Sequence, residues 1–161
     1  MAKRPTQEQT TDYIERWGMV FETLGGTRMM GKILGWLIVS DPPEQTAADI
    51  ALAVNASAGT VSTTTRTLVQ AAMIEKIGLP GKRSAYFRVK PGMWAQLMNA
   101  RLARMHVMGQ LADEGLELFP GADGEPNERL REIGSYIQFI EREFPALLDR
   151  WVKQWEKERT R

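Results

Sequence analysis

Apolar residues recur every three or four positions from Tyr13 to Leu24, where a Gly-Gly pair follows. Such spacing predicts an amphipathic helix that ends at the glycines. A second apolar segment begins near Thr27 and ends before two consecutive prolines, which cannot continue a helix. Gly31 and Gly35 lie one turn apart in this segment, and each costs about 1 kcal/mol in a helix relative to alanine. We therefore expect another backbone to pack closely against them.

The next two segments are short and lie close together in the chain. Residues 46–54 and 57–72 each place apolar side chains on one helical face. Asn55 lies in the connection, and asparagine tolerates the left-handed backbone that a tight turn between helices requires. Ser57 is a favourable N-terminal cap for the helix that follows. The pattern predicts a helix-turn-helix.

Two runs typical of β-strands follow the helix-turn-helix. They cover residues 73–77 and 85–89, and a segment with two glycines and a proline, residues 78–84, separates them. A β-hairpin after the second helix of a helix-turn-helix makes a winged helix. We expect the wing to close at Pro91-Gly92.

Two longer helical patterns occupy the rest of the chain. The first runs from residue 93 to about residue 119, and a polar loop at 121–127 separates it from the second. Pro145 should kink or split the second helix, and residues 157–161 should fray. The apolar positions of the second helix form a heptad-like stripe suited to pairing between subunits: Leu130, Ile133, Ile137, Ile140, Phe144, Leu147, Trp151 and Trp155.

The 161 residues suit one compact domain, or a small domain with an appended assembly element, better than two independent cores. The predicted fold class is mostly α with a small β-hairpin wing, that is, a winged helix-turn-helix plus long helices that form a dimerisation region. Residues 1–26 would hold an N-terminal helix that contributes to dimerisation, residues 27–91 the winged helix-turn-helix, and residues 92–161 the C-terminal helical dimerisation region.

Composition excludes several kinds of chemistry. The chain has no cysteine, which removes disulfides, zinc-thiolate sites, thiolate nucleophiles and iron–sulfur ligation. Its polar N-terminus lacks the apolar core of a signal peptide, and no apolar run approaches the ~20 residues of a membrane span. We expect a cytoplasmic protein that needs neither a cofactor nor a metal ion.

The net charge of +1 conceals an uneven distribution. Residues 57–90 contain six basic side chains and one acidic side chain, giving +5, whereas residues 111–149 contain three basic and ten acidic ones, giving −7. A basic winged helix beside an acidic helical body is the pattern expected when one face binds a polyanion. Lys82 and Arg83 at the tip of the wing suit contact with phosphates or the minor groove; the alternative is a solubilising turn.

The second helix of the helix-turn-helix carries a polar outer face. Val61, Leu68 and Ala72 share its apolar side, and small hydrogen-bonding side chains with one guanidinium lie opposite them. Such groups approach phosphates and base edges in a major groove. The alternative is an ordinary solvated face, but the adjoining wing favours DNA. The candidate DNA-binding residues are Ser57, Gly59, Thr60, Ser62, Thr63, Arg66, Gln70, Lys82 and Arg83.

The sequence offers little that could support catalysis. His106 is the single histidine, so it has no second imidazole for a metal site and is expected to be structural or exposed. Glu141 and Glu143 point in different directions on a predicted helix. Five tryptophans and nine methionines could line an effector cavity between the winged helix and the helical body, but core packing and dimer contacts would use the same residues.

Several short motifs accompany this order of elements: LG at 24–25, GKILGWL at 31–37, SDP at 40–42, ADIA at 48–51, SAGTVS at 57–62 and PGKR at 80–83 before Tyr86. Together they make the chain similar, over nearly its whole length, to the GbsR-like branch of the MarR superfamily of bacterial transcriptional regulators. The resemblance implies a homodimeric DNA-binding repressor or activator with a palindromic operator. Some members respond to small molecules such as choline-type cations. Asn55 stands where many helix-turn-helix proteins have glycine, and no effector-site residue can be matched individually.

These observations predict a sequence-specific, double-stranded DNA-binding transcriptional regulator that acts as a homodimer. A small-molecule effector, whose identity the residues do not indicate, is left open as a further partner. The alternative is a winged-helix module for protein–protein interaction without DNA binding. That module would retain its interaction when Lys82 and Arg83 are replaced by glutamate, whereas a DNA-binding protein would lose affinity. An enzyme is not expected.

Overall fold

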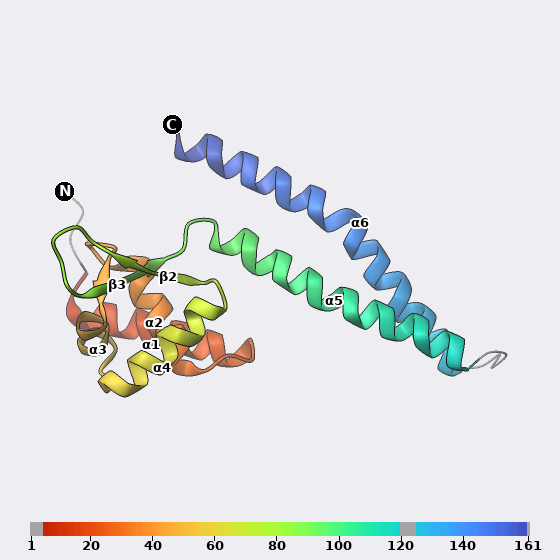
Figure 1. Cartoon of the computed structure of the whole chain (residues 1–161), viewed down its shortest axis with the longest axis horizontal. Helices are drawn as coiled ribbons and strands as arrows, with labels where there is room; N and C mark the ends of the chain where they lie inside the picture. Colours follow the sequence, from red (N-terminus) through yellow and green to blue (C-terminus); the bar gives the residue numbers. More distant parts are fainter. Residues whose placement is uncertain (1–4, 120–124, 161) are drawn as a thin grey trace. The chain divides into compact units, whose positions relative to one another are not determined.

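The described part of the chain, residues 5–119 and 125–160, forms six helices and three short strands in a computed structural model (Figure 1). The chain divides into two compact units, Met1–Met93 and Trp94–Arg161. The first unit contains the winged helix and the second contains the two long helices. The elements are α1 (Gln7–Thr23), α2 (Arg28–Val39), β1 (Gln45–Thr46), α3 (Ala47–Val54), α4 (Ala58–Gln70), β2 (Ile74–Gly78), β3 (Ala85–Val89), α5 (Met93–Leu118) and α6 (Glu125–Arg159).

Helices α1 and α2 pack together at positions without side chains. A Cβ placed on Gly31 of α2 would lie 2.8 Å from the Cα of Gly18 in α1, and one placed on Gly35 would lie 2.8 Å from the Trp17 side chain. Real Cβ atoms do not approach other atoms so closely, so both positions require glycine. The close backbone packing predicted at these glycines is confirmed for Gly31, whereas the close neighbour of Gly35 is the Trp17 side chain. The tight fit at both positions explains why the helix tolerates two residues of poor helix propensity.

Local capping defines the helix-turn-helix. Asn55 ends α3 with a φ of 50°, which confirms the predicted left-handed turn. Ser57 caps α4, and its hydroxyl accepts a hydrogen bond from the Thr60 amide at 3.1 Å, as predicted. The predicted end of α4 is wrong, because the helix stops at Gln70. Ala72, expected on the buried helical face, has a φ of 56°, and this backbone conformation directs the chain out of the helix toward β2.

Asp49 completes a capping box at the start of α3 and gives this helix a pH dependence. Its carboxylate accepts hydrogen bonds from the Thr46 hydroxyl at 2.6 Å and from the Thr46 amide at 2.9 Å. These bonds, the side-chain one first, lower the pKa of Asp49 below its ordinary value. The pKa of Asp49 is therefore lower in the folded chain than in the unfolded chain. The capping box contributes its full stabilisation above the pKa of the unfolded chain, and this stabilisation is lost as the pH falls through the pKa of the folded chain.

We therefore expect the melting temperature of the wild type to fall more steeply below about pH 4 than that of the variant D49N, because only the wild type loses a carboxylate acceptor there. Circular dichroism melting curves recorded from neutral to acidic pH measure the difference. Parallel declines of the two proteins would show that this cap does not contribute to the pH dependence.

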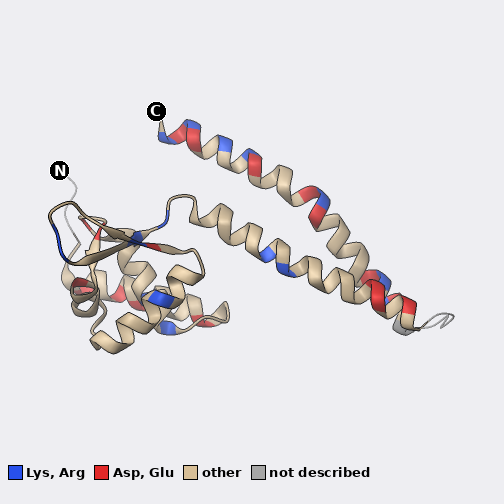
Figure 2. Ribbon diagram, in the orientation of Figure 1, with Lys and Arg blue, Asp and Glu red and all other residues tan. Residues whose placement is uncertain are grey.

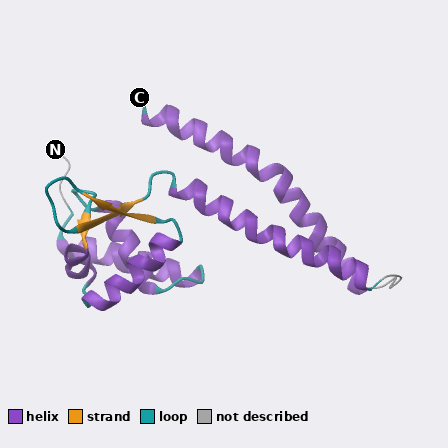
Figure 3. Ribbon diagram, viewed as in Figure 1, coloured by secondary structure: helices purple, strands orange, loops and turns teal. Residues whose placement is uncertain are grey.

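The three strands form one antiparallel sheet in the order β1-β3-β2 (Figure 3). β2 and β3 are the predicted hairpin, with Glu75 opposite Arg88. Strand β1 has no counterpart in the sequence prediction, because its two residues are too few to show a strand pattern; Gln45 pairs with Phe87 of β3. The result is the predicted mostly α fold with a small sheet. Its core contains Ile14, Phe21, Ile33, Leu34, Leu37, Ile50, Val54, Val61, Leu68, Ile74, Phe87 and Met93.

In the second unit, α5 and α6 pack through small residues. A Cβ on Gly109 of α5 would lie 3.2 Å from Ile137, and one on Gly115 would lie 3.1 Å from Leu130. Part of the predicted apolar stripe of α6 is thus used within this unit, where Ile137 is buried. Other large members of the stripe are exposed: Ile133, Leu147, Trp151 and Trp155.

Helix α6 differs from the prediction at its ends. It begins at Glu125, so the expected polar loop is shorter than residues 121–127; residues 120–124 lie outside the described part. The helix continues through Pro145 without a split and extends to Arg159, past residue 157, where fraying is predicted to begin. The Thr160 hydroxyl donates to the Glu156 carbonyl at 3.0 Å and supports this last turn. Among the described helices, none is both long and apolar enough to cross a membrane.

Candidate nucleic-acid interface

The outer face of α4 is exposed in the first unit. The helix buries its apolar side together with Thr64 and Thr65, and the Thr65 hydroxyl donates to the Val61 carbonyl at 2.8 Å. A buried hydroxyl of this kind has its hydrogen bond satisfied and serves packing. The run of hydroxyl residues is therefore divided between core and surface. The candidate residues of this helix and its cap are all exposed: Ser57, Gly59, Thr60, Ser62, Thr63, Arg66 and Gln70.

The first turn of α4 is polar and sterically open. The hydroxyls of Ser57 and Thr60 lie 2.9 Å apart, so the cap holds both side chains at the positive end of the helix. A Cβ placed on Gly59 would meet only the Ser57 hydroxyl oxygen, at 3.9 Å. Packing within the chain does not require glycine at this position, although glycine costs a helix about 1 kcal/mol relative to alanine.

Lys82 and Arg83 are exposed in the loop that joins β2 to β3, and Figure 2 shows basic residues along this loop. The Lys82 amide donates to the Leu79 carbonyl at 3.1 Å, and Gly81 has a φ of 73°. Glycine adopts a positive φ without steric cost, so the sequence of this turn suits its geometry. The loop and α4 belong to the same compact unit, which brings both predicted groups of site residues together in one body.

Arg88 does not add a free positive charge to the wing. Its Nε donates to Glu75 Oε1 at 2.6 Å, and its Nη1 donates to Glu44 Oε1 at 3.4 Å. These hydrogen bonds, that to Glu75 first, raise the pKa of Arg88 above its ordinary value. The charge of +5 counted along residues 57–90 already includes Glu75, and Glu44, which lies outside that range, lowers the local charge by one more. The basic residues classed as exposed in this part of the structure are Arg66, Lys76, Lys82 and Arg83.

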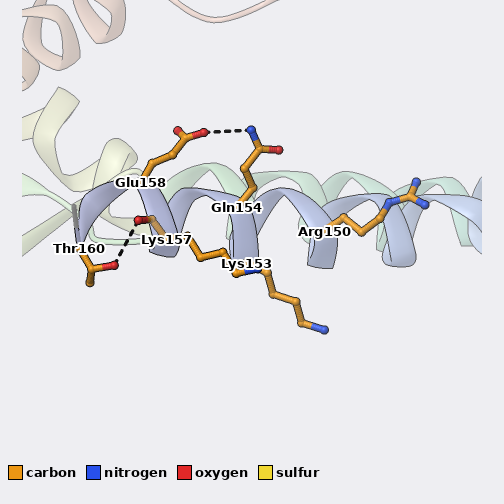
Figure 4. A pocket seen from close by; sticks show the side chains of 6 residues that line it. All are labelled: Arg150, Lys153, Gln154, Lys157, Glu158 and Thr160. Atoms are coloured by element: carbon orange, nitrogen blue, oxygen red, sulfur yellow. Dashed lines mark hydrogen bonds between the residues drawn. The ribbon is translucent and has the colours of Figure 1, made fainter.

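A second basic surface lies at the C-terminal end of α6. Figure 4 shows Arg150, Lys153 and Lys157 on this segment, where Gln154 Nε2 also donates to Glu158 Oε1 at 2.9 Å. All these side chains come from one helix, so the hollow that they border is an open stretch of helix surface. No candidate residue from the sequence lies here.

His106, Trp17 and Trp36 make contacts within their own compact units, whereas Trp94, Trp151 and Trp155 are exposed. His106 is exposed, and its Nδ1 lies 2.8 Å from Glu141 Oε1, which links α5 to α6. Trp17 and Trp36 pack against the core of the first unit, and Trp36 Nε1 donates to Gln45 Oε1 at 3.2 Å. Within residues 5–119 and 125–160, no group of three or more acidic or histidine side chains is arranged to hold a metal ion.

Comparison with known proteins finds relatives that match most of the chain. Residues 92–154 match the family described as MmpR5-like MarR family transcriptional regulator. The chain is 35% identical over 143 residues to the HTH-type transcriptional regulator MmpR5 of Mycobacterium tuberculosis, a match that covers 89% of this chain and 87% of that protein. A crystal structure of a transcriptional regulator superposes with a TM-score of 0.76 and 34% identity, covering 89% of this chain and 98% of that one.

The fold and these similarities define a winged helix-turn-helix protein of the transcription-regulator class. More particularly, the chain belongs to the MarR family of transcriptional regulators. The MarR membership predicted from the sequence motifs is thereby confirmed. The matching family is the MmpR5-like one, so the GbsR-like branch is not confirmed. The matched relatives are regulators of transcription, not enzymes.

Proposed function

We propose that the protein is a cytoplasmic homodimer that binds double-stranded DNA at specific sequences and thereby regulates transcription. One observation carries the proposal: the polar outer face of α4 is exposed, in the same unit as a hairpin whose tip exposes Lys82 and Arg83. Hydroxyl, amide, guanidinium and ammonium groups are the side-chain groups that bind phosphates and base edges. Membership of the MarR family supports the same conclusion.

In this proposal α4 is the recognition helix and enters the major groove. Arg66 and Gln70 would reach base edges or phosphates, and the threonine methyl groups would contact thymine methyls. Gly59 would allow the DNA to approach the first turn of α4 closely, which accounts for a glycine that packing within the chain does not require. The proposed DNA-binding residues on this helix and its cap are Ser57, Gly59, Thr60, Ser62, Thr63, Arg66 and Gln70.

The wing would contact the DNA beside the recognition helix. Lys82 and Arg83 would bind the adjacent phosphates or the minor groove, where positive side chains meet the strongest negative potential. Two such surfaces in a twofold dimer would meet successive major grooves about 34 Å apart, which requires a palindromic operator. This proposal assigns DNA binding to residues 27–91.

Exposed apolar side chains on the terminal helices support a dimer. Leu24, at the end of α1, is 60% exposed, and Trp155 of α6 is 52% exposed. Leu147 and Trp151, which are also exposed, share one helical face with Trp155, and large apolar side chains on an uncovered face mark an association surface. We assign dimerisation to residues 1–26 and 92–161, and sedimentation should give twice the monomer mass of 18.2 kDa.

Selection from genomic DNA tests sequence specificity. The protein is mixed with a pool of genomic fragments, and the bound duplexes are recovered and sequenced. Enrichment of a motif with twofold symmetry supports the proposal, whereas recovery of fragments without a shared motif contradicts it. Repeating the selection with choline-type cations tests the small-molecule effector, which the proposal includes without an assigned binding site.

DNA affinity should depend steeply on salt. With about four phosphates neutralised per subunit, roughly eight per dimer, the logarithm of the binding constant should fall with the logarithm of the salt concentration at a slope near −7. Fluorescence anisotropy of a labelled duplex at a series of salt concentrations measures this slope. Binding that does not change with salt would exclude the proposed phosphate contacts.

A second candidate function is a winged-helix module that binds proteins and not DNA. The exposed apolar residue Leu52 of α3 favours this alternative, because it is 85% exposed in the helix that precedes α4. A protein partner would bury such a side chain. Reversal of the charges at Lys82 and Arg83 separates the two functions, because DNA binding depends on these charges.

A further inference from the structure

Arg88 connects all three strands at the base of the wing. β3 is the central strand; Glu75 lies opposite Arg88 on β2, and Glu44 directly precedes β1 on the other side. The side chains of Arg88, Glu44 and Glu75 are 37%, 24% and 29% exposed, compared with 64% and 69% for the surface pair of Arg16 and Asp12. Solvent therefore screens the Arg88 contacts less than an ordinary surface ion pair.

The Arg88 contacts continue into the core of the first unit through Gln45. This residue is buried, its Oε1 accepts from Trp36 Nε1 of α2 at 3.2 Å, and its Nε2 donates to the Pro42 carbonyl at 2.7 Å. Gln45 is thus held on both sides, and it fixes the backbone of the neighbouring Glu44. The ion pair of Arg88 with Glu44, the peptide bond from Glu44 to Gln45 and the hydrogen bond between Gln45 and Trp36 together link the hairpin to α2.

We propose that Arg88 is a positioning residue for DNA binding and contacts no phosphate itself. Held by Glu44 and Glu75, it sets the direction of the hairpin so that Lys82 and Arg83 reach the DNA. Arg83 precedes Arg88 by five residues, about 16 Å of extended chain, so a rotation of about 15° at the base moves the tip by about 4 Å. This displacement exceeds the tolerance of a hydrogen bond. The inference rests on the proposed function.

Removal of the two carboxylates separates positioning from simple electrostatics. The variant E44Q/E75Q makes each subunit more positive by two charges, so electrostatics alone would tighten DNA binding. A positioning role predicts the opposite, a loss of about tenfold in affinity, similar to that of R88Q. The probe is a fluorescein-labelled duplex carrying a fragment from the genomic selection, and anisotropy at fixed salt gives the affinities.

A double-mutant cycle shows whether Arg88 acts through the tip of the wing. In the background K82A/R83A, the substitution R88Q should cause no further loss of affinity, because the groups that Arg88 positions are absent. R66Q on α4 is the matched control and should remain additive with K82A/R83A. A general loss of structure would lower affinity in either background. If R88Q does not fold, E44Q/E75Q replaces it in the cycle, and melting curves identify the folded variants.

The outcomes distinguish this inference from the proposed function. If the wild-type protein shows no salt-dependent binding to any duplex, the proposed function is wrong and Arg88 has nothing to position. If the wild type binds but E44Q/E75Q binds more tightly, or R88Q stays additive with K82A/R83A, the inference about Arg88 alone is overturned. Weaker binding by E44Q/E75Q together with a non-additive cycle supports it.

Discussion

The variant K82E/R83E is expected to bind duplex DNA at least about 100-fold more weakly than the wild type at about 0.1 M salt. Both side chains are exposed at the tip of the wing, so their reversal should not disturb the core. A dimer would lose four of roughly eight phosphate contacts, and the salt slope should fall from about −7 to about −3.5. Fluorescence anisotropy across a salt series measures both quantities.

The variant K153E/K157E is the matched control for this reversal. It changes the charge by the same amount at the exposed end of α6, in the other compact unit (Figure 4). We expect it to change DNA affinity by less than about threefold, because the proposal assigns no DNA contact to this unit and exposed charges are screened by salt. Equal losses in both variants would attribute the effect to net charge. Wild-type affinity in K82E/R83E would refute the DNA proposal and favour the protein-interaction module.

The substitution G31A is expected to destabilise the first unit by about 3 kcal/mol, because its methyl group would enter a space that α1 already fills. The added Cβ would lie 2.8 Å from the Cα of Gly18 and 2.8 Å from the Cβ of Phe21. The first of these atoms is helical backbone, which cannot rotate away as a long side chain can. For a unit of this size, the melting temperature should fall by about 12 to 24 °C.

The substitution G59A makes the same chemical change where the structure is open. A Cβ at this position meets only one atom, at 3.9 Å, so alanine should stabilise α4 by up to about 1 kcal/mol through its higher helix propensity. Thermal denaturation of both variants by circular dichroism compares the two sites. A wild-type melting temperature for G31A would show that α1 and α2 are not packed as closely as the structure indicates.

Much of the candidate interface is accessible from the sequence because it lies on one helix. Once Val61 and Leu68 are assigned to the buried side of α4, the helical period leaves Arg66 and Gln70 on the outer face. The structure exposes both side chains, as this reasoning requires. The same period places Thr63 on the outer face, whereas Thr64 falls at the edge of the buried side, so its burial also depends on how α4 is rotated against its neighbours.

The sequence by itself determined the order of the helices, the Ser57 cap and the left-handed turn at Asn55, because each depends on groups within one or two turns of chain. The tertiary structure alone decided that β1 joins the sheet and that Arg88 is held by two carboxylates. Glu44 and Arg88 are 44 residues apart, and only the packed fold brings them within hydrogen-bonding distance. Hence Arg88, which the sequence shows only as one of the cations in a basic segment, serves in our proposal to position the binding surface.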